Sequence, residues 1–519
     1  MNLYALRILV TTEAHLRLRR LSTLVTVFVV AAIGFWMFAD QDSGYAFIAV
    51  KNAAVVNTSS TLALGSVSLF ALVFGLAGFF LTRGRIAEDV RCGTGAVIGS
   101  SPISSVLFLT CRWLGGVAYL MVMATVFMLS VMVCHLLRGA GPIQLWVYLE
   151  TYLIILFPLI CFSVSCAVLF DSIPSLMGKL GDVVFFFLWV LQLASLAAFE
   201  TVTGSLSGLL LFDFSGVTMV IQSLHAQLGS NDISLGYANF DTSLPRLTLG
   251  NDLWSFPMIL MRCASAGLAS LVVVPAFLFF HRYSSDKIKV SQTNYRRTPI
   301  ALLNQLLRPL TQLVQPLFHL AANLPGMVGA ALADVALTLI ASPSAILALL
   351  AVWSCAIFLR IDLLPGVLLI ATVFWGISVG DVATRDFANG SEDMTGAVGC
   401  GVVQRYLRQF SATVFLGLLF SGLPMLRLAF HHPFQAWSTL TGLLSLSALA
   451  SVFGRTARTP RLFLCLFLFW VYVATQVPKS AIVDILGFNG AADVNSTLIQ
   501  ISIAIVALLF GYCYNRWAR

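Results

Sequence analysis

The chain has 519 residues, of which 59% are hydrophobic and only 10% are charged. A water-soluble protein of this length carries charged residues at about a quarter of its positions, so the composition excludes a soluble globular protein and points to a surface that faces lipid. The net charge of +8 does not indicate nucleic-acid binding, because the Lys and Arg residues lie in short loops between apolar segments and form no single basic face.

The first predicted element is an amphipathic helix over residues 1–20. Its apolar residues recur at helical spacing: Leu3, Leu6, Val10, Ala14 and Leu18. The same segment carries several arginines, and no small-residue cleavage site follows it, which argues against a signal peptide. We expect this helix to lie on the cytoplasmic surface of the membrane.

Twelve apolar segments follow, each close to the roughly 20 residues needed to cross a bilayer. In the first half of the chain they lie near residues 21–39, 62–82, 113–137, 147–170, 180–199 and 255–280. In the second half they lie near residues 343–360, 362–380, 410–430, 434–453, 462–477 and 496–514. The sequence therefore predicts an all-α, polytopic membrane protein with about 12 transmembrane helices.

The distribution of positive charge predicts the orientation. With both termini in the cytoplasm, most of the 30 Lys and Arg residues fall inside, as the positive-inside rule requires. The exceptions are Lys51, Arg138, Arg246, Arg262, Arg360, Arg427 and Lys479.

The chain also divides into two six-helix repeats. Residues 1–280 are expected to form a first half with its interfacial helix, residues 281–324 a basic cytoplasmic linker, and residues 325–519 a second half. The second half opens with another amphipathic segment, over residues 325–340. Six spans return the chain to the same side of the membrane, so the repeats have parallel orientation.

A short motif supports the repeat. After the second span the chain reads Asp89-x-x-x-Gly93-Thr94, and after the eighth it reads Asp386-x-x-x-Gly390-Ser391. Asp, Gly and hydroxyl residues cap and end short helices. Each loop is therefore either a short charged helix that docks on a soluble partner or an ordinary solvated loop. The candidate contact residues are Arg85, Glu88, Asp89, Arg91, Gly93, Thr94, Arg385, Asp386, Gly390, Ser391 and Glu392.

The sequence contains no recognisable catalytic motif. A Walker A motif, a Ser-His-Asp arrangement, a C-x-x-C pair and an H-E-x-x-H motif are all missing from the sequence. We therefore expect no catalytic residue, no metal site and no cofactor in this chain, and no enzymatic activity. Acidic residues lie in loops or at span ends, with Glu150 and Asp182 nearest to the bilayer interior, so a proton relay has little support.

At the two loops the sequence resembles the permeases of type-2 ATP-binding-cassette (ABC) exporters. A half of that family has an interfacial helix, six spans and a cytoplasmic loop after the second span. That loop contains, in order, an acidic residue, Gly followed by Thr or Ser, Ser-Pro, and a basic residue at the start of the third span. In the first loop the matching positions are Asp89, Gly93-Thr94, Ser101-Pro102 and Arg112. In the second loop they are Asp386, Gly390-Ser391-Glu392 and Arg405 or Arg408. The second loop departs from the pattern because it lacks Ser-Pro.

The family also places a long outer segment, often with re-entrant helices, between its fifth and sixth spans. Residues 200–254 match that segment and contain an apolar stretch at 209–220, whereas the counterpart at 478–495 is much shorter.

The resemblance implies the membrane subunit of an ABC exporter in a bacterial plasma (inner) membrane, with multi-pass topology. Two copies of a separate cytoplasmic ATPase would hold ATP and Mg and would bind at the two loops. Membrane lipid is expected as a neighbour and nucleic acid is not. The substrate would be hydrophobic or amphiphilic and would pass between the halves, along spans one, two, five, seven, eight and eleven. The candidate path residues are Phe35, Phe74, Trp189, Gln192, Trp353, Trp375, Phe469 and Trp470.

Two other classes of membrane protein fit the sequence less well. A secondary carrier of the major facilitator type also has six plus six spans and a basic central loop. Its second-span loop carries a Gly-x-x-x-Asp-Arg-x-Gly-Arg pattern, which Arg83 to Asp89 do not fit. A membrane-embedded lipid-modifying enzyme would need a polar cluster at one interface, and the sequence shows none.

Overall fold

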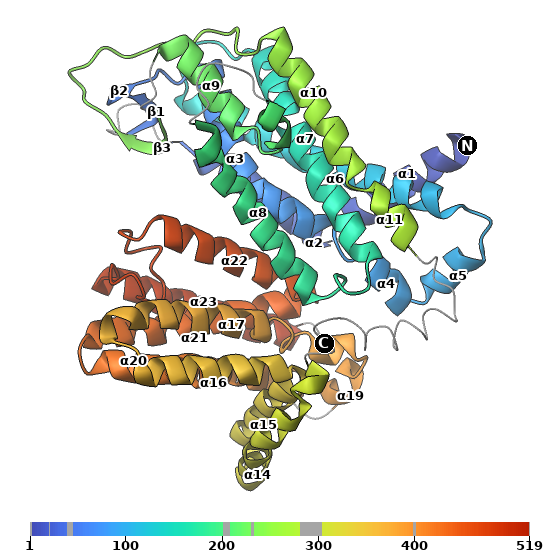
Figure 1. Cartoon of the computed structure of the whole chain (residues 1–519), viewed down its shortest axis with the longest axis vertical. Helices are drawn as coiled ribbons and strands as arrows, with labels where there is room; N and C mark the ends of the chain where they lie inside the picture. The colour runs from blue at the N-terminus through green and yellow to red at the C-terminus, as the bar shows by residue number, and fades with distance from the viewer. Residues whose placement is uncertain are drawn as a thin grey trace. The chain divides into compact units, whose positions relative to one another are not determined.

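The structure is a computed structural model that describes residues 3–19, 21–38, 45–200, 208–229, 233–280, 304–397 and 401–517. The chain divides into two compact units, Met1–Thr293 and Asn294–Arg519. Both are built almost entirely of helices (Figure 1). Helices are the expected solution for apolar segments, because in hydrocarbon each backbone N–H and C=O group must be satisfied within its own segment.

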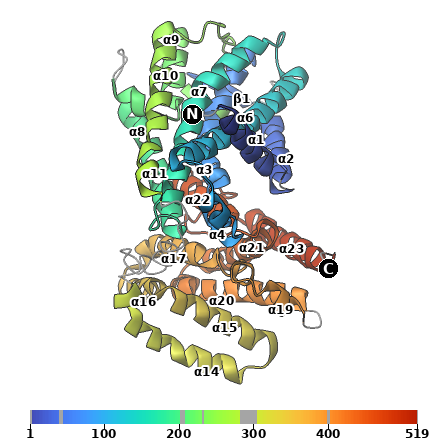
Figure 2. The same ribbon diagram turned by 90° about the vertical axis from the view of Figure 1, so that its right-hand side faces the viewer.

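Unit 1 begins with an elbow. The helices α1 (Leu3–Leu18) and α2 (Leu21–Trp36) are bent by 72° relative to each other. The remaining long helices are α3 (Ser59–Thr82), α6 (Ser105–Arg138), α7 (Leu145–Ser172), α8 (Lys179–Glu200) and α10 (Phe256–Leu271), which the short α11 (Val274–Phe279) follows. The helix α3 is buried on nearly all sides and packs along α7, so it forms the centre of the unit (Figure 1, Figure 2).

One end of unit 1 carries the strands, which the sequence analysis did not predict. The strands β1 (Tyr45–Val50), β2 (Ala53–Ala54) and β3 (Ile233–Asn239) form an antiparallel sheet in the order β2-β1-β3. Lys51 and Asn52 join β1 to β2 with φ of 47° and 63°, the backbone of a tight two-residue hairpin turn.

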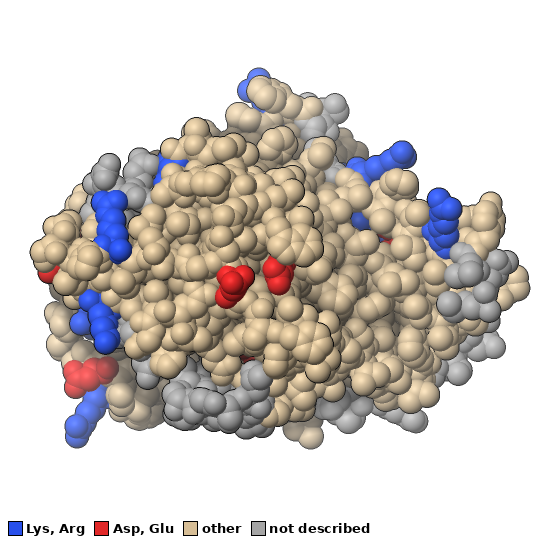
Figure 3. Space-filling view, turned by 90° about the horizontal axis from the view of Figure 1, so that it is seen from above, with Lys and Arg blue, Asp and Glu red and all other residues tan. Residues whose placement is uncertain are grey.

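The long outer segment of unit 1 also contains helical structure. The apolar stretch at 209–220 falls on η1 (Gly208–Phe212) and on the start of α9 (Val217–Leu228). Seen from above, the surface is mostly uncharged and its charged side chains stand singly or in small groups (Figure 3).

Unit 2 also begins with an elbow. The helices α15 (Gly326–Ala341) and α16 (Pro343–Phe358) meet at 101°. The spans that follow are α17 (Leu364–Val379), α20 (Gly401–Ala429), α21 (Pro433–Ala457), α22 (Arg461–Gln476) and α23 (Val494–Trp517), with the short η4 (Ile361–Leu363) before α17. The helix α21 packs against both α20 and α23.

Part of the predicted linker 281–324 is folded onto unit 2. Residues Arg308–Val314 form η3 and residues Gln315–Asn323 form α14, and both pack against α15. Residues 281–303 lie outside the described residues. The boundary between the two units falls at Thr293 and Asn294, inside this predicted linker.

The prediction of a multi-pass helical membrane protein is confirmed at this level. Every predicted span coincides with a helix. Within the described residues eight helices are long and apolar enough to cross a membrane, and the number is ten if each elbow pair counts as one span. The helix α22 has only 16 residues and α8 is not among the eight, so the total of twelve spans stays a prediction.

The two units share a second motif that the sequence analysis missed. Between the last two spans of each half the chain reads Asp-x-x-Gly, at Asp213–Gly216 and at Asp484–Gly487. The two glycines have φ of 73° and 68°. The Asp213 carboxylate accepts backbone N–H bonds from Gly216 at 2.9 Å and Thr218 at 3.1 Å. The Asp484 carboxylate is held in the same way, by N–H groups at 3.1 and 3.0 Å. Both outer segments therefore turn around a buried carboxylate.

Both termini are expected in the cytoplasm. Arginine is frequent near the N-terminus and Arg516 lies at the end of α23, while Arg519 lies outside the described residues. Reporter fusions at each end, one active only in the cytoplasm and one active only outside, test this orientation. An outside signal from either terminus would contradict it.

Candidate functional site

The first loop is shaped by two glycines. The span α3 ends at Thr82, and the short helices α4 (Arg85–Arg91) and α5 (Thr94–Ser100) follow. Gly84 and Gly93 precede them with φ of 92° and 72°, a left-handed conformation that favours glycine. A side chain at Gly93 would meet nothing within 4 Å, so the backbone conformation and not crowding requires glycine there.

The Asp-Gly-Thr motif of this loop closes on the third span. The Asp89 carboxylate forms an ion pair with Arg112 of α6. The Thr94 hydroxyl donates to the Asp89 backbone carbonyl at 3.3 Å. Asp89 is thereby held at both its side chain and its backbone, and α4 and α5 are fastened to the start of α6.

The same loop is tied to the amphipathic helix α1. The Arg85 guanidinium lies 3.0 Å from Glu13 and 2.7 Å from Glu88. Glu13 also pairs with Arg17 at 3.1 Å, and Arg17 donates to the Thr82 carbonyl at the end of α3 at 3.3 Å. A movement of the loop would therefore carry α1 with it.

The base of the loop is a buried triad that the sequence analysis did not predict. The Arg83 side chain is fully buried and pairs with Asp182 at the start of α8 and with Asp171 at the end of α7, the latter at 3.5 Å. Asp171 also accepts the backbone N–H of Gly84 at 2.7 Å. Asp182, which the sequence suggested as an interfacial or proton-relay residue, is thus a partner of Arg83.

The second loop repeats this arrangement. It consists of α18 (Arg385–Ala388), a left-handed Gly390 with φ of 67°, and α19 (Glu392–Gly396). The Ser391 hydroxyl donates to the Asp386 carbonyl at 3.2 Å, and the Asp386 carboxylate lies 3.4 Å from Arg408 of α20. The predicted equivalence of Asp89-Gly93-Thr94 with Asp386-Gly390-Ser391 therefore extends to their contacts.

The structure also distinguishes the two arginines that the sequence left as alternatives. Arg408 holds Asp386, as Arg112 holds Asp89. Arg405 instead donates to the backbone carbonyl of Glu392 at 2.8 Å.

The second loop is tied to α15, the counterpart of α1. Arg385 donates to the Thr338 hydroxyl at 2.6 Å, and Arg408 pairs with Asp334 at 2.8 Å. Each unit thus connects its loop to its amphipathic helix and to its third span through side-chain contacts.

Glu392 has additional contacts that the first loop lacks. Its carboxylate pairs with Arg405 and with Arg455 of α21, and Arg455 also donates to Asn515 of α23 at 2.7 Å. Burial by itself would raise the pKa of Glu392, but the hydrogen bond from Arg455 and the neighbouring arginine charges hold the pKa below its ordinary value of 4.5.

This lowered pKa predicts a pH-dependent effect of the substitution Glu392→Gln. A carboxyl group whose pKa falls on folding stabilises the fold fully above its unfolded pKa, and this contribution is lost as the pH falls through the folded pKa. We expect Glu392→Gln to lower the melting temperature at pH 7, and the difference from the parent protein to shrink as the pH falls from 4.5 downwards. The exposed Asp393, changed to Asn, is the matched control. A difference that stays constant down to pH 3 would contradict the assignment.

Each loop exposes apolar side chains. Val97 is 71% exposed, Val90 is 44% exposed and Met394 is 78% exposed. The charged candidates Arg85, Glu88, Asp89, Arg385, Asp386 and Glu392 all have partners within their own unit. The side chain of Arg91 lies outside the described residues. These charged groups therefore position the loops, and the surface left for a partner combines exposed apolar side chains with exposed polar ones such as Asn389 and Asp393.

The predicted path residues are distributed over both units. Phe35, Phe74, Trp189 and Gln192 lie in unit 1, and Trp353, Trp375, Phe469 and Trp470 lie in unit 2. The indole N–H groups donate to backbone carbonyls: Trp189 to Leu72, Trp353 to Leu419, Trp375 to Thr413 and Trp470 to Val483, at 2.8–3.1 Å. The Gln192 amide donates to Phe212 at 3.0 Å. The indole N–H groups are thus used within the fold, and Phe74, Trp189 and Trp375 are buried, at 3%, 3% and 1% exposed, so their rings have little free surface for a substrate.

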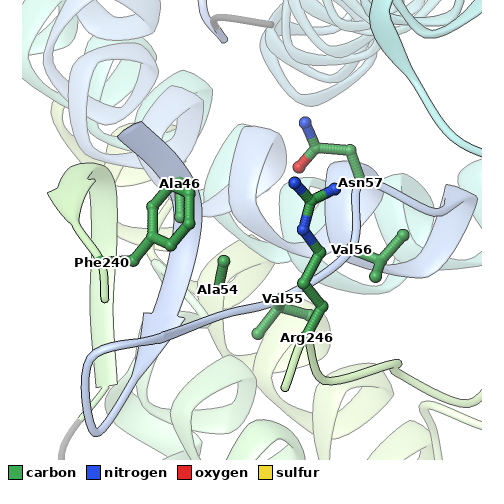
Figure 4. Close-up of a pocket in the computed structure, with 7 residues that line it drawn as sticks. All are labelled: Ala46, Ala54, Val55, Val56, Asn57, Phe240 and Arg246. Carbon is green, nitrogen blue, oxygen red and sulfur yellow. The ribbon is translucent and has the colours of Figure 1, made fainter. Parts of the chain in front are cut away.

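Unit 1 has a small pocket beside the sheet, lined by Ala46, Ala54, Val55, Val56, Asn57, Phe240 and Arg246 (Figure 4). Its volume is about 10 Å³, which is room for about one water molecule, so it is not a substrate site. Among the described residues no group of three His, Cys, Asp or Glu side chains could hold a metal ion.

Comparison of the chain with protein-family models, with curated proteins and with solved structures finds no match.

Proposed function

We propose that this chain is the membrane-spanning permease subunit of an ABC exporter in a bacterial plasma membrane. It would move a hydrophobic or amphiphilic substrate with energy from ATP that a separate ATPase subunit hydrolyses. The observation that carries the proposal is the duplicated loop. Each unit builds the same Asp, left-handed Gly, hydroxyl and Arg arrangement at the same point after a span, which suits two copies of one partner.

The contacts around the loops suit the transmission of force. In unit 1 the loop is joined to α1 through Arg85 and Glu13, to α6 through Asp89 and Arg112, and at its base to α7 and α8 through Arg83. A partner that displaced the tip would move several helices together. If the loops bind one conformation of the ATPase more tightly than another, this difference in binding free energy would shift the equilibrium between two conformations of the membrane helices.

The docking contact in this proposal is apolar. The sequence suggested that loop charges pair across the contact, but those charges are satisfied within each unit. Val97 of α5 and Met394 of α19 project instead, with 71% and 78% of their surface exposed. Burying such side chains against a partner contributes about 1.5–3 kcal/mol each, more than an exposed ion pair of about 0–1 kcal/mol.

The test is purification of the tagged chain from its native membrane with its partner. We expect an ATP-hydrolysing subunit with a Walker A motif, at two copies per chain. Val97→Asp and Met394→Asp, separately and together, should reduce the co-purified ATPase, with the double variant losing most of it.

Leu244→Asp is the matched control, because Leu244 is an exposed apolar residue, 40% exposed, in the outer segment of unit 1. Unchanged complex formation by the double variant would reject the docking surface. Transport by the chain alone, driven by a proton gradient, would reject the ABC proposal and favour the major facilitator class.

A further inference from the structure

The segment before α15 carries an unexpected amphipathic helix. The sequence placed residues 304–323 in a cytoplasmic linker, but η3 and α14 pack against α15, and α14 runs alongside it (Figure 1, Figure 2). Asn304 accepts the backbone N–H of Ser344 at 3.1 Å, so the segment starts at the α15–α16 elbow. It then runs away from the elbow to the turn at 324–325, from which α15 returns.

The close packing of this hairpin depends on one glycine. A side-chain carbon at Gly329 of α15 would lie 2.1 Å from the Leu324 carbonyl oxygen and 2.6 Å from that of Ala321. No real side chain fits at those distances, so glycine allows the end of α14 to lie against the start of α15. The position of α14 is therefore fixed by packing.

The direction of the hairpin follows from the elbow. The helix α16 runs along α17 and α20, and Trp353 of α16 donates to the Leu419 carbonyl of α20 at 2.9 Å. Because α15 is turned by 101° from α16, α15 and α14 run nearly perpendicular to the spans. Contacts of α15 with Arg385 and Arg408 place it at the end of the unit that carries the second loop.

Three exposed leucines, called here the leucine stripe, occur from η3 to the end of α14. They are Leu313 of η3, Leu320 of α14 and Leu324 just after α14, exposed by 60%, 50% and 37%. One position before each of these leucines stands an exposed polar residue: Gln312, His319 and Asn323. Successive positions of an α-helix are about 100° apart, so within α14 the exposed side chains of His319 and Leu320 lie on adjacent sides. Val314 of η3 and Ala321 of α14 are buried against the unit.

The helix α1 has the same pattern in unit 1. Tyr4, Ile8 and Leu16 are exposed by 73%, 44% and 51%, next to exposed Arg7, Thr11 and His15. Helix α1 also meets its span at an elbow. A helix parallel to the membrane with one stripe in water and one in the acyl boundary needs this arrangement.

We propose that α14 is an additional membrane-surface helix, whose exposed leucine stripe lies in the interfacial layer of the lipid leaflet beside the second loop. In this proposal lipid covers the leucine stripe, because α14 lies across the ends of the spans. Through α15, α14 is also connected to α16, which runs along the spans α17 and α20. Residues 304–323 contain no Asp, Glu or Lys, so no strongly hydrated charge except Arg308 opposes insertion. Unit 2 is thus held on the leaflet by a hairpin of two helices.

Depth measurement on the full chain in nanodiscs of phosphatidylcholine and phosphatidylglycerol tests this proposal. The background variant has five cysteines changed to Ala: Cys92, Cys263, Cys355, Cys400 and Cys513. A single cysteine with an environment-sensitive fluorophore is then introduced by Leu313→Cys or Leu320→Cys. The matched controls are Gln315→Cys and His319→Cys, which are also exposed but lie on the polar side.

We expect the labels at 313 and 320 to be quenched several-fold more by lipids spin-labelled near the headgroup than by aqueous iodide. The labels at 315 and 319 should show the reverse order. Equal iodide quenching at 319 and 320 would overturn the proposal. Protection from iodide at 320 without quenching by lipid would also overturn it, and would mean that protein covers the stripe. Position 313 gives an independent reading if the variant at 320 does not fold.

Discussion

Replacing Arg83 with Met is expected to destabilise unit 1 by about 3–5 kcal/mol, because it breaks the buried ion pairs of Arg83 with two carboxylates. The side chain of Arg83 is fully buried, and those of Asp171 and Asp182 are each 4% exposed. Arg83 also donates to the Gly178 carbonyl at 3.1 Å, so its loss further releases the turn between α7 and α8. The effect should be large because this side chain joins three helices, α3, α7 and α8.

The measurement is thermal unfolding of the detergent-solubilised protein, monitored by the loss of the monodisperse peak in size-exclusion chromatography. The matched control is Arg7→Met, since Arg7 is an exposed arginine on α1. The triple variant that adds Asp171→Asn and Asp182→Asn should recover part of the loss, because it leaves no uncompensated charge. An Arg83→Met variant as stable as the Arg7→Met control would contradict the triad.

Replacing Arg262 with Met is expected to cost about 3 kcal/mol or more, for a different reason. Arg262 is 2% exposed and donates only to backbone carbonyl groups among its described hydrogen bonds. Two of those acceptors are Ile154 and Ile155 of α7, at 3.1 and 2.9 Å, and two are Asp213 and Phe214 of the outer turn. A buried carbonyl that loses its donor costs about 1–3 kcal/mol. Four carbonyls would lose a donor here.

One of these carbonyls has no donor in its own helix. Pro158 lies inside α7 and has no N–H group, so the carbonyl four residues earlier, that of Ile154, is left open. The guanidinium of Arg262 fills this position. Pro158→Ala would supply the missing N–H group to Ile154.

A double-mutant cycle therefore tests the account of Arg262. We expect Arg262→Met to destabilise the Pro158→Ala background less than it destabilises the parent protein, again judged by thermal unfolding. The isosteric change Ser265→Ala on the same helix serves as a control for disturbance of α10. Strictly additive losses would mean that the guanidinium does not replace the missing N–H group.

The features that the sequence predicted well are local ones. The spans coincide with helices because a bilayer selects for apolar runs of a given length, and that property is read within one segment. The amphipathic helices α1 and α15 were anticipated for the same reason, from their spacing of apolar residues. The Asp89-Gly93-Thr94 motif and its repeat were also legible, because a left-handed glycine after a short helix is a requirement of the local backbone.

The features that only the tertiary structure decided depend on distant partners. Arg83 and Asp182 are 99 positions apart, and β1 pairs with a strand that begins at Ile233, so neither contact has a signature in a local window. The choice of Arg408 over Arg405 as the partner of Asp386 depends on which face of α20 meets the loop.

The same limit explains two differences between the structure and what the sequence suggested. Loop charges looked available for a partner because their intramolecular partners, such as Glu13 for Arg85 and Asp334 for Arg408, lie on helices far away in the sequence. Residues 304–323 looked like a linker because α14 has only nine residues, too few for a clear period without the packing against α15. Hydrophobicity and spacing are properties of a single segment and can be read from the sequence. Ion pairing and exposure are properties of the packed chain. Only the tertiary structure therefore shows which residues of the loops remain exposed for a partner.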